Sequence, residues 1–312
     1  MPFKHKHLIG IQNLTAADIK TILSTADSML EISSREVKKV PVLRGKTIVN
    51  LFFEPSTRTR GSFELAAKRL SADISNFSKS SSSTLKGETF KDTVLNLEAM
   101  NTDAIIVRHA CAGAPHFMST FCRSHILNAG DGSHEHPTQA LLDAFTIRQY
   151  KKRFKGLKVV IVGDILHSRV ARSNLFCLQK LGARVTLVGP PSLVPSVFKS
   201  IGAEIEHDFN LAAHRADVIM MLRIQLERQQ KNFFPSLREY RSLYSLTESR
   251  LARAKKNAIV MHPGPINRDI EISTPLADSN RSVILQQVEN GVAVRMAVLT
   301  LLLGGNNREN TH

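Results

Sequence analysis

The sequence predicts an α/β fold of two domains, each with a mostly parallel sheet flanked by helices, joined by long interdomain helices. Short apolar runs rich in β-branched residues, which are typical of buried parallel strands, alternate with segments that have apolar residues at helical spacing. The alternation restarts midway along 312 residues, a length that allows two cores of ordinary size. The hydrophobic content of 42% and charged content of 22% are typical of globular proteins.

The first half opens with a predicted helix at residues 15–30, in which Thr15 is the N-cap and Asp18 follows three residues later. A buried strand is predicted at 46–53, and helical spacing of apolar residues returns at 63–70, in a helix that begins near Thr57 or Thr59. The elements expected next are strands at 74–77, 104–107 and 125–128, a helix at 89–100 and a long helix from Pro137.

The second half restarts after a basic segment at residues 150–156. Its strands are predicted at 157–162, 184–188, 217–222 and 258–261, with helices between them and a final helix from Ile284 to Leu303. We place the domain boundary in the helix at 135–150. One domain then covers residues 1–140, completed by a C-terminal helix at 286–305, and the other covers 150–285.

The charge and the cysteines limit the class of protein. The formal charge is +15 and the isoelectric point is near 10.0, but the basic residues are scattered and carry no interleaved aromatic side chains of the kind that stack on bases. We therefore favour a solvated basic surface over a nucleic-acid partner. Three cysteines without metal-ligand spacing argue against a disulfide framework and fit a reducing cytoplasm. No apolar run is long enough for a secretory signal or a membrane span, so we expect no membrane role.

An anion site is predicted where the first strand ends. Ser56, Thr57, Arg58 and Thr59 follow that strand and open a helix, whose first amide groups have no partners within the helix. Hydroxyl groups, the helix dipole and a planar guanidinium together suit phosphate oxygens. Helix capping with a surface arginine is the alternative, but the carboxyl end of a parallel strand is where such sheets bind ligands. For Arg60 we expect a structural ion pair with Glu54 or Glu88.

Two further segments of the first half carry candidate residues. Arg108 lies at the end of the strand at 104–107, and His136 and Gln139 lie at the start of the helix that Pro137 opens. The helix dipole disfavours a charged histidine there, so His136 could donate a hydrogen bond to a carbonyl oxygen, with helix capping as the alternative. His134 and His136 lack a third ligand at a characteristic spacing and form only a weak zinc pattern. The serine-rich loop at 78–88 is either a flexible linker or a lid that closes over an anion.

The second half offers arginines at strand ends. Arg169 opens the helix after the strand at 157–162, and Arg223 and Gln225 follow the strand at 217–222. Together the arginines could hold a substrate with two carboxylates, because each guanidinium matches one carboxylate. The first loop lacks the G-x-G-x-x-G pattern, which disfavours a nicotinamide oxidoreductase.

The motifs taken together resemble the aspartate/ornithine carbamoyltransferase family, and the chain is more similar to its aspartate-specific members. The resemblance covers residues 8–303 and rests on the order and spacing of 56–60 (STRTR), 86–88 (KGE), 108–109 (RH), 136–139 (HPTQ), 223–225 (RIQ) and 262–265 (HPGP). It implies transfer of a carbamoyl group from carbamoyl phosphate to L-aspartate, an early step of pyrimidine biosynthesis, with no metal or organic cofactor.

The resemblance also implies a role for each matching residue. Ser56, Thr57, Arg58 and Thr59 would hold the phosphate, Arg108 would bridge phosphate and carbonyl oxygen, and Thr59 and His136 would assist at that oxygen. The carbamoyl amide would be held by Gln139 and the backbone carbonyls of Pro263 and Gly264, and aspartate by Lys86, Arg169, Arg223 and Gln225. Gly264 stands where other members have leucine or alanine, and because backbone groups act there we expect little change.

The family assembles as homotrimers in which Ser82 and Lys86 reach a neighbouring subunit's site, so the resemblance implies shared active sites. It leaves open whether regulatory or dihydroorotase chains associate. The nearest alternative is a carbamoyltransferase that uses ornithine or a related amine, and a nucleic-acid-binding protein is the alternative from another class. An assay of aspartate against ornithine as acceptor separates the first pair.

Overall fold

The computed structural model describes residues 3–78, 88–224 and 236–304. The chain forms two compact units, one of Met1–Phe145 with Glu289–His312 and one of Thr146–Val288. Both boundaries lie within helices, α5 (Pro137–Lys151) and α11 (Ile284–Leu303). The predicted α/β fold with two parallel sheets is confirmed.

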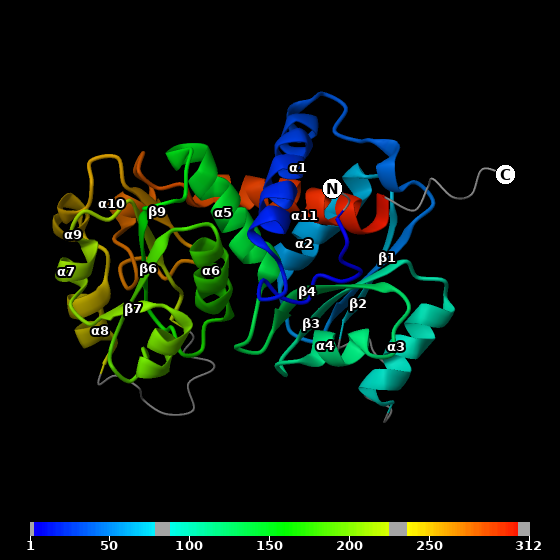
Figure 1. The fold of residues 1–312 in the computed structure, drawn as a ribbon, viewed down its shortest axis with the longest axis horizontal. Coiled ribbons are helices and arrows are strands. Elements are labelled where there is room, and N and C mark those ends of the chain that lie inside the picture. Colours follow the sequence, from blue (N-terminus) through cyan, green and yellow to red (C-terminus); the bar gives the residue numbers. More distant parts are fainter. Residues whose placement is uncertain (1–2, 79–87, 225–235, 305–312) are drawn as a thin grey trace. The chain divides into compact units, whose positions relative to one another are not determined.

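The first unit contains a parallel sheet of four strands in the order β2-β1-β3-β4. Val94 and Leu97 of one helix and Met118 of another pack on the sheet through Val49 and Ile105. These two helices, α3 and α4, cover one face, while α1, α2 and α11 lie on the other (Figure 1). The bounds are α1 Ala16–Ser34, β1 Thr47–Phe52, α2 Thr57–Arg69, β2 Asp73–Ser78, α3 Phe90–Ala99, β3 Ala104–His109, α4 Ala114–Ser119 and β4 His125–Asp131.

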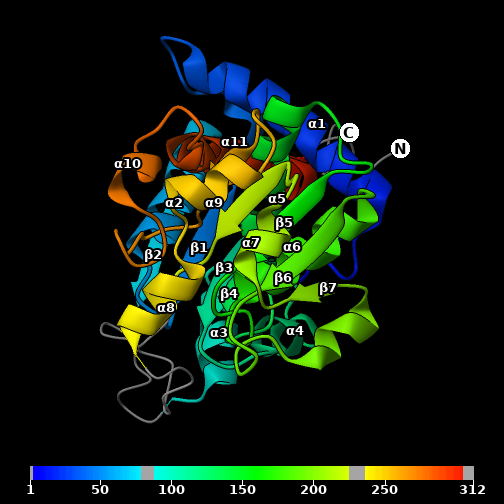
Figure 2. The same ribbon diagram turned by 90° about the vertical axis from the view of Figure 1, so that its left-hand side faces the viewer.

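The second unit contains a parallel sheet of five strands in the order β7-β6-β5-β8-β9. Phe209, Tyr240 and Leu251 pack from α7, α8 and α9 against the sheet, and Figure 2 shows these three helices on the near face. The bounds are β5 Lys158–Val162, α6 Arg169–Lys180, β6 Arg184–Val188, β7 Glu204–Glu206, α7 Phe209–Ala213, β8 Val218–Met221, α8 Leu237–Tyr244, α9 Glu248–Arg253, β9 Ile259–Met261 and α10 Thr274–Ala277.

Local signals in the sequence account for most element boundaries. The Thr15 hydroxyl accepts from the Asp18 amide at 3.1 Å and the Asp18 carboxylate accepts from the Thr15 amide at 2.8 Å, so the predicted capping pair starts α1. The predicted final helix has the observed bounds. The strand β7 was not predicted, because it is three residues long, carries Glu204 and Glu206, and pairs only at the sheet edge.

The three cysteines are free thiols, and Cys111 is exposed whereas Cys122 and Cys177 are buried. Over the described part of the chain, no helix combines the length and the apolar character needed to cross a bilayer.

Candidate active site

The strand order of the first sheet reverses between β1 and β3. From β1 the chain moves outward to β2, and from β3 it moves the opposite way to β4, so the loops after β1 and β3 diverge. Ligands of open α/β sheets bind at the carboxyl ends of strands where the order reverses in this way. The loop 53–56 follows β1, and Arg108 lies at the end of β3, so two of the predicted phosphate-binding segments flank this point.

The N-terminus of α2 lacks the capping features that start α1 and α3. The side chain of Ser56, the N-cap, makes no capping hydrogen bond, and the first turn contains no acidic residue. By contrast, α1 and α3 each have a threonine cap and an aspartate in the first turn. Arg58 lies in the first turn of α2 instead, where the helix dipole repels a cation. An anion bound here would accept hydrogen bonds from the amides, the hydroxyls and the arginine together.

Arg108 is half-buried next to this helix start. Its Nε lies 3.3 Å from a carboxylate oxygen of Glu54, and its Nη1 donates to the backbone carbonyl of Ala129 at 3.3 Å. Glu54 therefore forms its ion pair with Arg108. The predicted pair of Arg60 with Glu54 is wrong. The other proposed partner, Glu88, accepts from the Thr93 hydroxyl at 3.1 Å. The pairing with Glu54 orients the Arg108 guanidinium at the end of β3.

His136 and Gln139 lie after the carboxyl end of a third strand, β4. They follow β4 and occupy the start of α5, and both are buried, with exposed fractions of 4% and 8%. The backbone carbonyl of His136 accepts from the amide of Gln139 at 3.0 Å, which closes the first turn of the helix. The first sheet thus gathers Ser56, Thr57, Arg58, Thr59, Arg108, His136 and Gln139 at the carboxyl ends of β1, β3 and β4.

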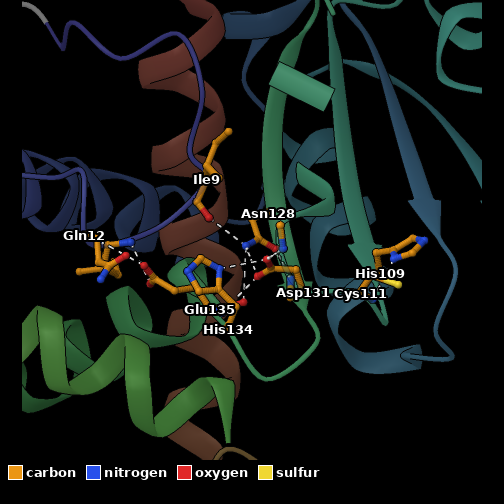
Figure 3. Close-up of polar contacts among 11 residues, drawn as sticks. Ile9, Gln12, His109, Cys111, Asn128, Asp131, His134 and Glu135 are labelled. Carbon is orange, nitrogen blue, oxygen red and sulfur yellow. Dashed lines mark hydrogen bonds and ion pairs between the residues drawn. The ribbon is translucent and has the colours of Figure 1, made fainter. Parts of the chain in front are cut away.

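Asp131 holds the turn between β4 and α5. Its carboxylate accepts from the Asn128 side chain at 2.8 Å, the Glu135 amide at 3.1 Å, the Gly113 amide at 2.8 Å and the His134 ring at 3.0 Å (Figure 3). Burial alone would raise the pKa of Asp131, but hydrogen bonds from His134, Gly113 and Asn128 outweigh it and lower the pKa. The backbone directly before His136 is therefore held from several sides.

Glu135 joins the same turn to the N-terminal segment. Its fully buried carboxylate accepts from the amides of Ile11 at 2.9 Å and Gln12 at 3.2 Å, and Asn128 donates to the Ile9 carbonyl at 2.8 Å (Figure 3). A Cβ atom on Gly10 would lie 2.4 Å from a Glu135 carboxylate oxygen, so a glycine is needed there. No local pattern marks Glu135, because its donors lie more than 120 positions away in the chain.

In the second sheet the strand order reverses between β5 and β8. Arg169 is buried and is the first residue of α6, after a serine cap in which the Ser168 hydroxyl accepts from the Ala171 amide at 3.1 Å. Arg223 is half-buried and follows β8. The two predicted arginines thus flank the reversal point of this sheet, as the phosphate segments flank that of the first.

The loop after β9 carries Pro263 and Gly264, which are half-buried. The amide of Gly264 donates to His262 Nδ1 at 2.8 Å, and His262 Nε2 donates to Glu271 at 2.9 Å. The other oxygen of Glu271 accepts from the amide of Ile224 at 2.8 Å. One buried carboxylate therefore connects the loop that contains Pro263 and Gly264 with the loop that contains Arg223. Nothing in the sequence had marked Glu271.

Three predicted site residues, Ser82, Lys86 and Gln225, lie outside the described residues. Within residues 3–78, 88–224 and 236–304, no three His, Cys, Asp or Glu side chains are grouped so that they could hold a metal ion. The imidazole of His134, which the sequence had suggested as a weak zinc ligand, is bonded to Asp131.

Comparison with known proteins gives matches over both units. The chain matches the carbamoyl-P binding domain of aspartate/ornithine carbamoyltransferases at residues 6–149 and their Asp/Orn binding domain at residues 155–302. The aspartate carbamoyltransferase catalytic subunit of Syntrophotalea carbinolica is 57% identical over 311 residues, which span 100% of this chain and 99% of the relative.

Two solved structures have similar folds. Aspartate transcarbamoylase from Trypanosoma cruzi, in complex with N-(phosphonacetyl)-L-aspartic acid, has a TM-score of 0.88 at 31% identity, over 96% of this chain and 97% of that one. Ornithine carbamoyltransferase from Pyrococcus furiosus has a TM-score of 0.85 at 32% identity, again over 96% and 97%. These matches over the full length show that the chain belongs to the aspartate/ornithine carbamoyltransferase family.

Proposed function

We propose that this protein is an aspartate carbamoyltransferase, which transfers the carbamoyl group of carbamoyl phosphate to the amine of L-aspartate and gives N-carbamoyl-L-aspartate and phosphate. The observation that carries the proposal is the start of α2, an uncapped helix N-terminus with arginine instead of acid in its first turn, beside Arg108. Such an arrangement is unfavourable without a ligand and favourable with a phosphate group.

The reaction needs positioning and charge stabilisation. The amine of aspartate attacks the carbonyl carbon, the carbonyl oxygen becomes an oxyanion, and the carbon–oxygen bond to phosphate then breaks. We assign Arg108, Thr59 and His136 to the developing oxyanion, because preorganised donors stabilise charge that appears in the transition state. Ser56, Thr57 and Arg58 hold the leaving phosphate, which takes the amine proton. Gln139 and the carbonyls of Pro263 and Gly264 hold the carbamoyl nitrogen.

Aspartate is the acceptor that the second unit favours. Arg169 and Arg223 flank the reversal point of its sheet, and two guanidinium groups match two carboxylates, whereas ornithine has one carboxylate and a second amine. The Syntrophotalea carbinolica relative, which is 57% identical, is an aspartate carbamoyltransferase catalytic subunit. Gln225 and Lys86, outside the described residues, complete the aspartate site in this proposal. The free thiols are consistent with a reducing compartment, and we place the reaction in the cytoplasm, as an early step of pyrimidine biosynthesis.

The test compares acceptors and arginine variants. We expect the purified protein to carbamoylate aspartate and not ornithine, and Arg58→Ala to lose at least about a hundredfold in turnover, since removing one transition-state donor has that effect in other enzymes. Arg60→Ala, a change in the same helix, is the matched control and should keep most activity. Near-normal turnover by Arg58→Ala, or preference for ornithine, would contradict the proposal.

A further inference from the structure

The side-chain amide of Gln139 has a defined orientation. Its nitrogen, Nε2, donates to Oδ1 of Asp143 at 3.0 Å, one turn further along α5, and Asp143 is fully buried. An ionised carboxylate only accepts hydrogen bonds, so the nitrogen and not the oxygen of the amide must face Asp143. The amide oxygen Oε1 is therefore the group that points elsewhere, and among the described residues no donor occupies it.

Arg295 supports the charge of Asp143. This arginine of α11 is buried, and burial lowers its pKa to about 10 while the charge of Asp143 acts in the opposite direction, so it stays cationic at neutral pH. It donates to the Ser62 hydroxyl of α2 at 2.9 Å, and its guanidinium lies 5.0 Å from the centre of the Phe63 ring. A nearby cation favours the carboxylate form of a buried acid.

The space around this guanidinium is filled. Its Nη1 also donates to the Gly291 carbonyl at 3.0 Å, and a Cβ atom on Gly291 would lie 2.7 Å from Nη1. Gly291 has no side chain to displace the arginine, which is thereby fixed between α11 and α2. Ser62 of α2 and Gly291 of α11 thus hold Arg295, whose charge acts on Asp143, and the Asp143 carboxylate accepts from Gln139 at the start of α5.

We propose that Asp143 is a positioning residue that sets the polarity of the Gln139 amide, so that the site accepts a hydrogen-bond donor on the group to be transferred. The inference rests on the proposed function. Oε1 then accepts from the carbamoyl nitrogen, which distinguishes carbamoyl phosphate from acetyl phosphate, whose methyl group donates nothing. A reversed amide would place N–H groups against the N–H groups of the substrate, and unpaired buried polar groups are costly.

The test is Asp143→Asn, which keeps the size of the side chain and allows the Gln139 amide to take either orientation. We expect the KM for carbamoyl phosphate to rise about tenfold, because one well-placed polar contact discriminates by roughly this factor. The inhibition constants of acetyl phosphate and inorganic phosphate, measured in competition with carbamoyl phosphate, should change less than about twofold, since neither donates to Oε1. Equal weakening of all three compounds would indicate a structural role only, and an unchanged KM would also overturn the inference.

A double exchange, Gln139→Glu with Asp143→Asn, gives a second test. The introduced asparagine would donate to the introduced glutamate, which again presents only acceptors to the carbamoyl nitrogen, and the total charge beside Arg295 is retained. This variant keeps the test usable if Asp143→Asn does not fold. We expect it to recover the preference for carbamoyl phosphate over acetyl phosphate, and a preference as low as in Asp143→Asn, or lost outright, would contradict the inference.

The wild-type protein separates the two proposals. If it forms no carbamoyl-aspartate, the proposed function fails. If it forms the product and Asp143→Asn leaves the preference between the two phosphates unchanged, only the role of Asp143 fails.

Discussion

Glu271 lies fully buried between the loop after β8 and the loop after β9. Its carboxylate accepts from the amides of Ile224 at 2.8 Å and Asn267 at 2.9 Å, from the Asn267 side chain at 2.7 Å and from His262 at 2.9 Å. The amide of Gly264 donates to His262 Nδ1, so the imidazole is the tautomer that carries its proton on Nε2 and donates it to Glu271. The carboxylate therefore only accepts, from every side.

Glu271→Gln should change the KM for aspartate more than the KM for carbamoyl phosphate. The substituted amide places an N–H group against other N–H donors, and hydrogen bonds to charged groups contribute about 1.5–3 kcal/mol each. We expect a lower urea midpoint and a higher KM for aspartate, because Arg223 lies next to Ile224 in the disturbed loop, with a smaller change in the KM for carbamoyl phosphate. The control is Asp269→Asn, which removes an exposed carboxylate that bonds Thr274 in the same loop. Equal changes in both KM values would contradict the assignment.

At the scale of elements, the start of α2 is suited to the proposed phosphate more than to the stability of the helix. An acid in the first turn stabilises a helix by about 0.3–1 kcal/mol, yet α2 has none there. The exposed residue Thr57 is the first residue of the helix. Binding sites commonly retain such unfavourable features because they are needed for function.

Thr57→Glu should therefore weaken phosphate binding and stabilise the unliganded protein. We expect the unliganded protein to gain about 0.3–1 kcal/mol in free energy of unfolding. The stabilisation that added phosphate gives to the wild type should be lost, because the carboxylate repels the anion. Thr57→Gln has nearly the same shape without the charge and serves as the control. Thermal unfolding with and without phosphate measures both effects, and phosphate stabilisation of Thr57→Glu equal to that of Thr57→Gln would refute the anion site.

The N-terminal segment is a second element whose contacts make a prediction. Leu8 pairs with β4, its amide donating to the Ile126 carbonyl at 2.8 Å, and the Ile126 amide donates to His7 Nδ1 at 3.0 Å. Burial, and then the charges of Lys6 and His125, lower the pKa of His7 from 6.5 to about 4. The folded protein thus holds His7 neutral where the unfolded chain would bind a proton.

The stability of the protein should fall as the pH is lowered from about 6.5 to about 4, since only the unfolded state takes up the proton in this range. Above 6.5 the contribution of His7 is fully present, and below about 4 both states are protonated. His7→Gln keeps an acceptor without titrating, so its unfolding midpoint should depend less on pH. His116→Gln, at an exposed position of α4, is the control. Identical slopes for His7→Gln and the wild type would contradict the assignment.

At the scale of the whole molecule, the proposed homotrimer with shared sites can be tested by mixing inactive chains. Lys86→Ala and His136→Ala remove residues that we assign to opposite sides of a shared site. In randomly mixed trimers about a quarter of the sites contain neither change, so about a quarter of wild-type activity should return. A mixture of His136→Ala and Arg108→Ala is the control, because both residues lie on one sheet of one chain and cannot complement each other. No recovery in the first mixture would count against sharing.

Many features of this protein depend on residues that are close in the sequence. The capping pair of Thr15 and Asp18, the buried strands and the polar start of α2 follow from chain neighbours, because caps and periodicity act within one or two turns. The candidate residues at 56–59 and Arg108, His136, Arg169 and Arg223 could be found for the same reason, since they follow a predicted strand or open a helix. The roles of Ser82, Lys86, Pro263 and Gly264 came only from the resemblance to the family.

The sequence by itself therefore determined the fold class, most elements and the segments of the candidate site. Only the tertiary structure decided the order of the strands, and with it that β1 and β3, and β5 and β8, are the neighbours between which the loops diverge. It also decided which groups surround Asp131, Asp143 and Glu271. A buried carboxylate is stable only where donors or a cation lie near it: Asp131 accepts from Gly113 and Glu271 accepts from Ile224, each in another segment of the chain, and the charge of Arg295 of α11 acts on Asp143. These contacts between distant segments arise from tertiary packing, which local sequence patterns do not predict.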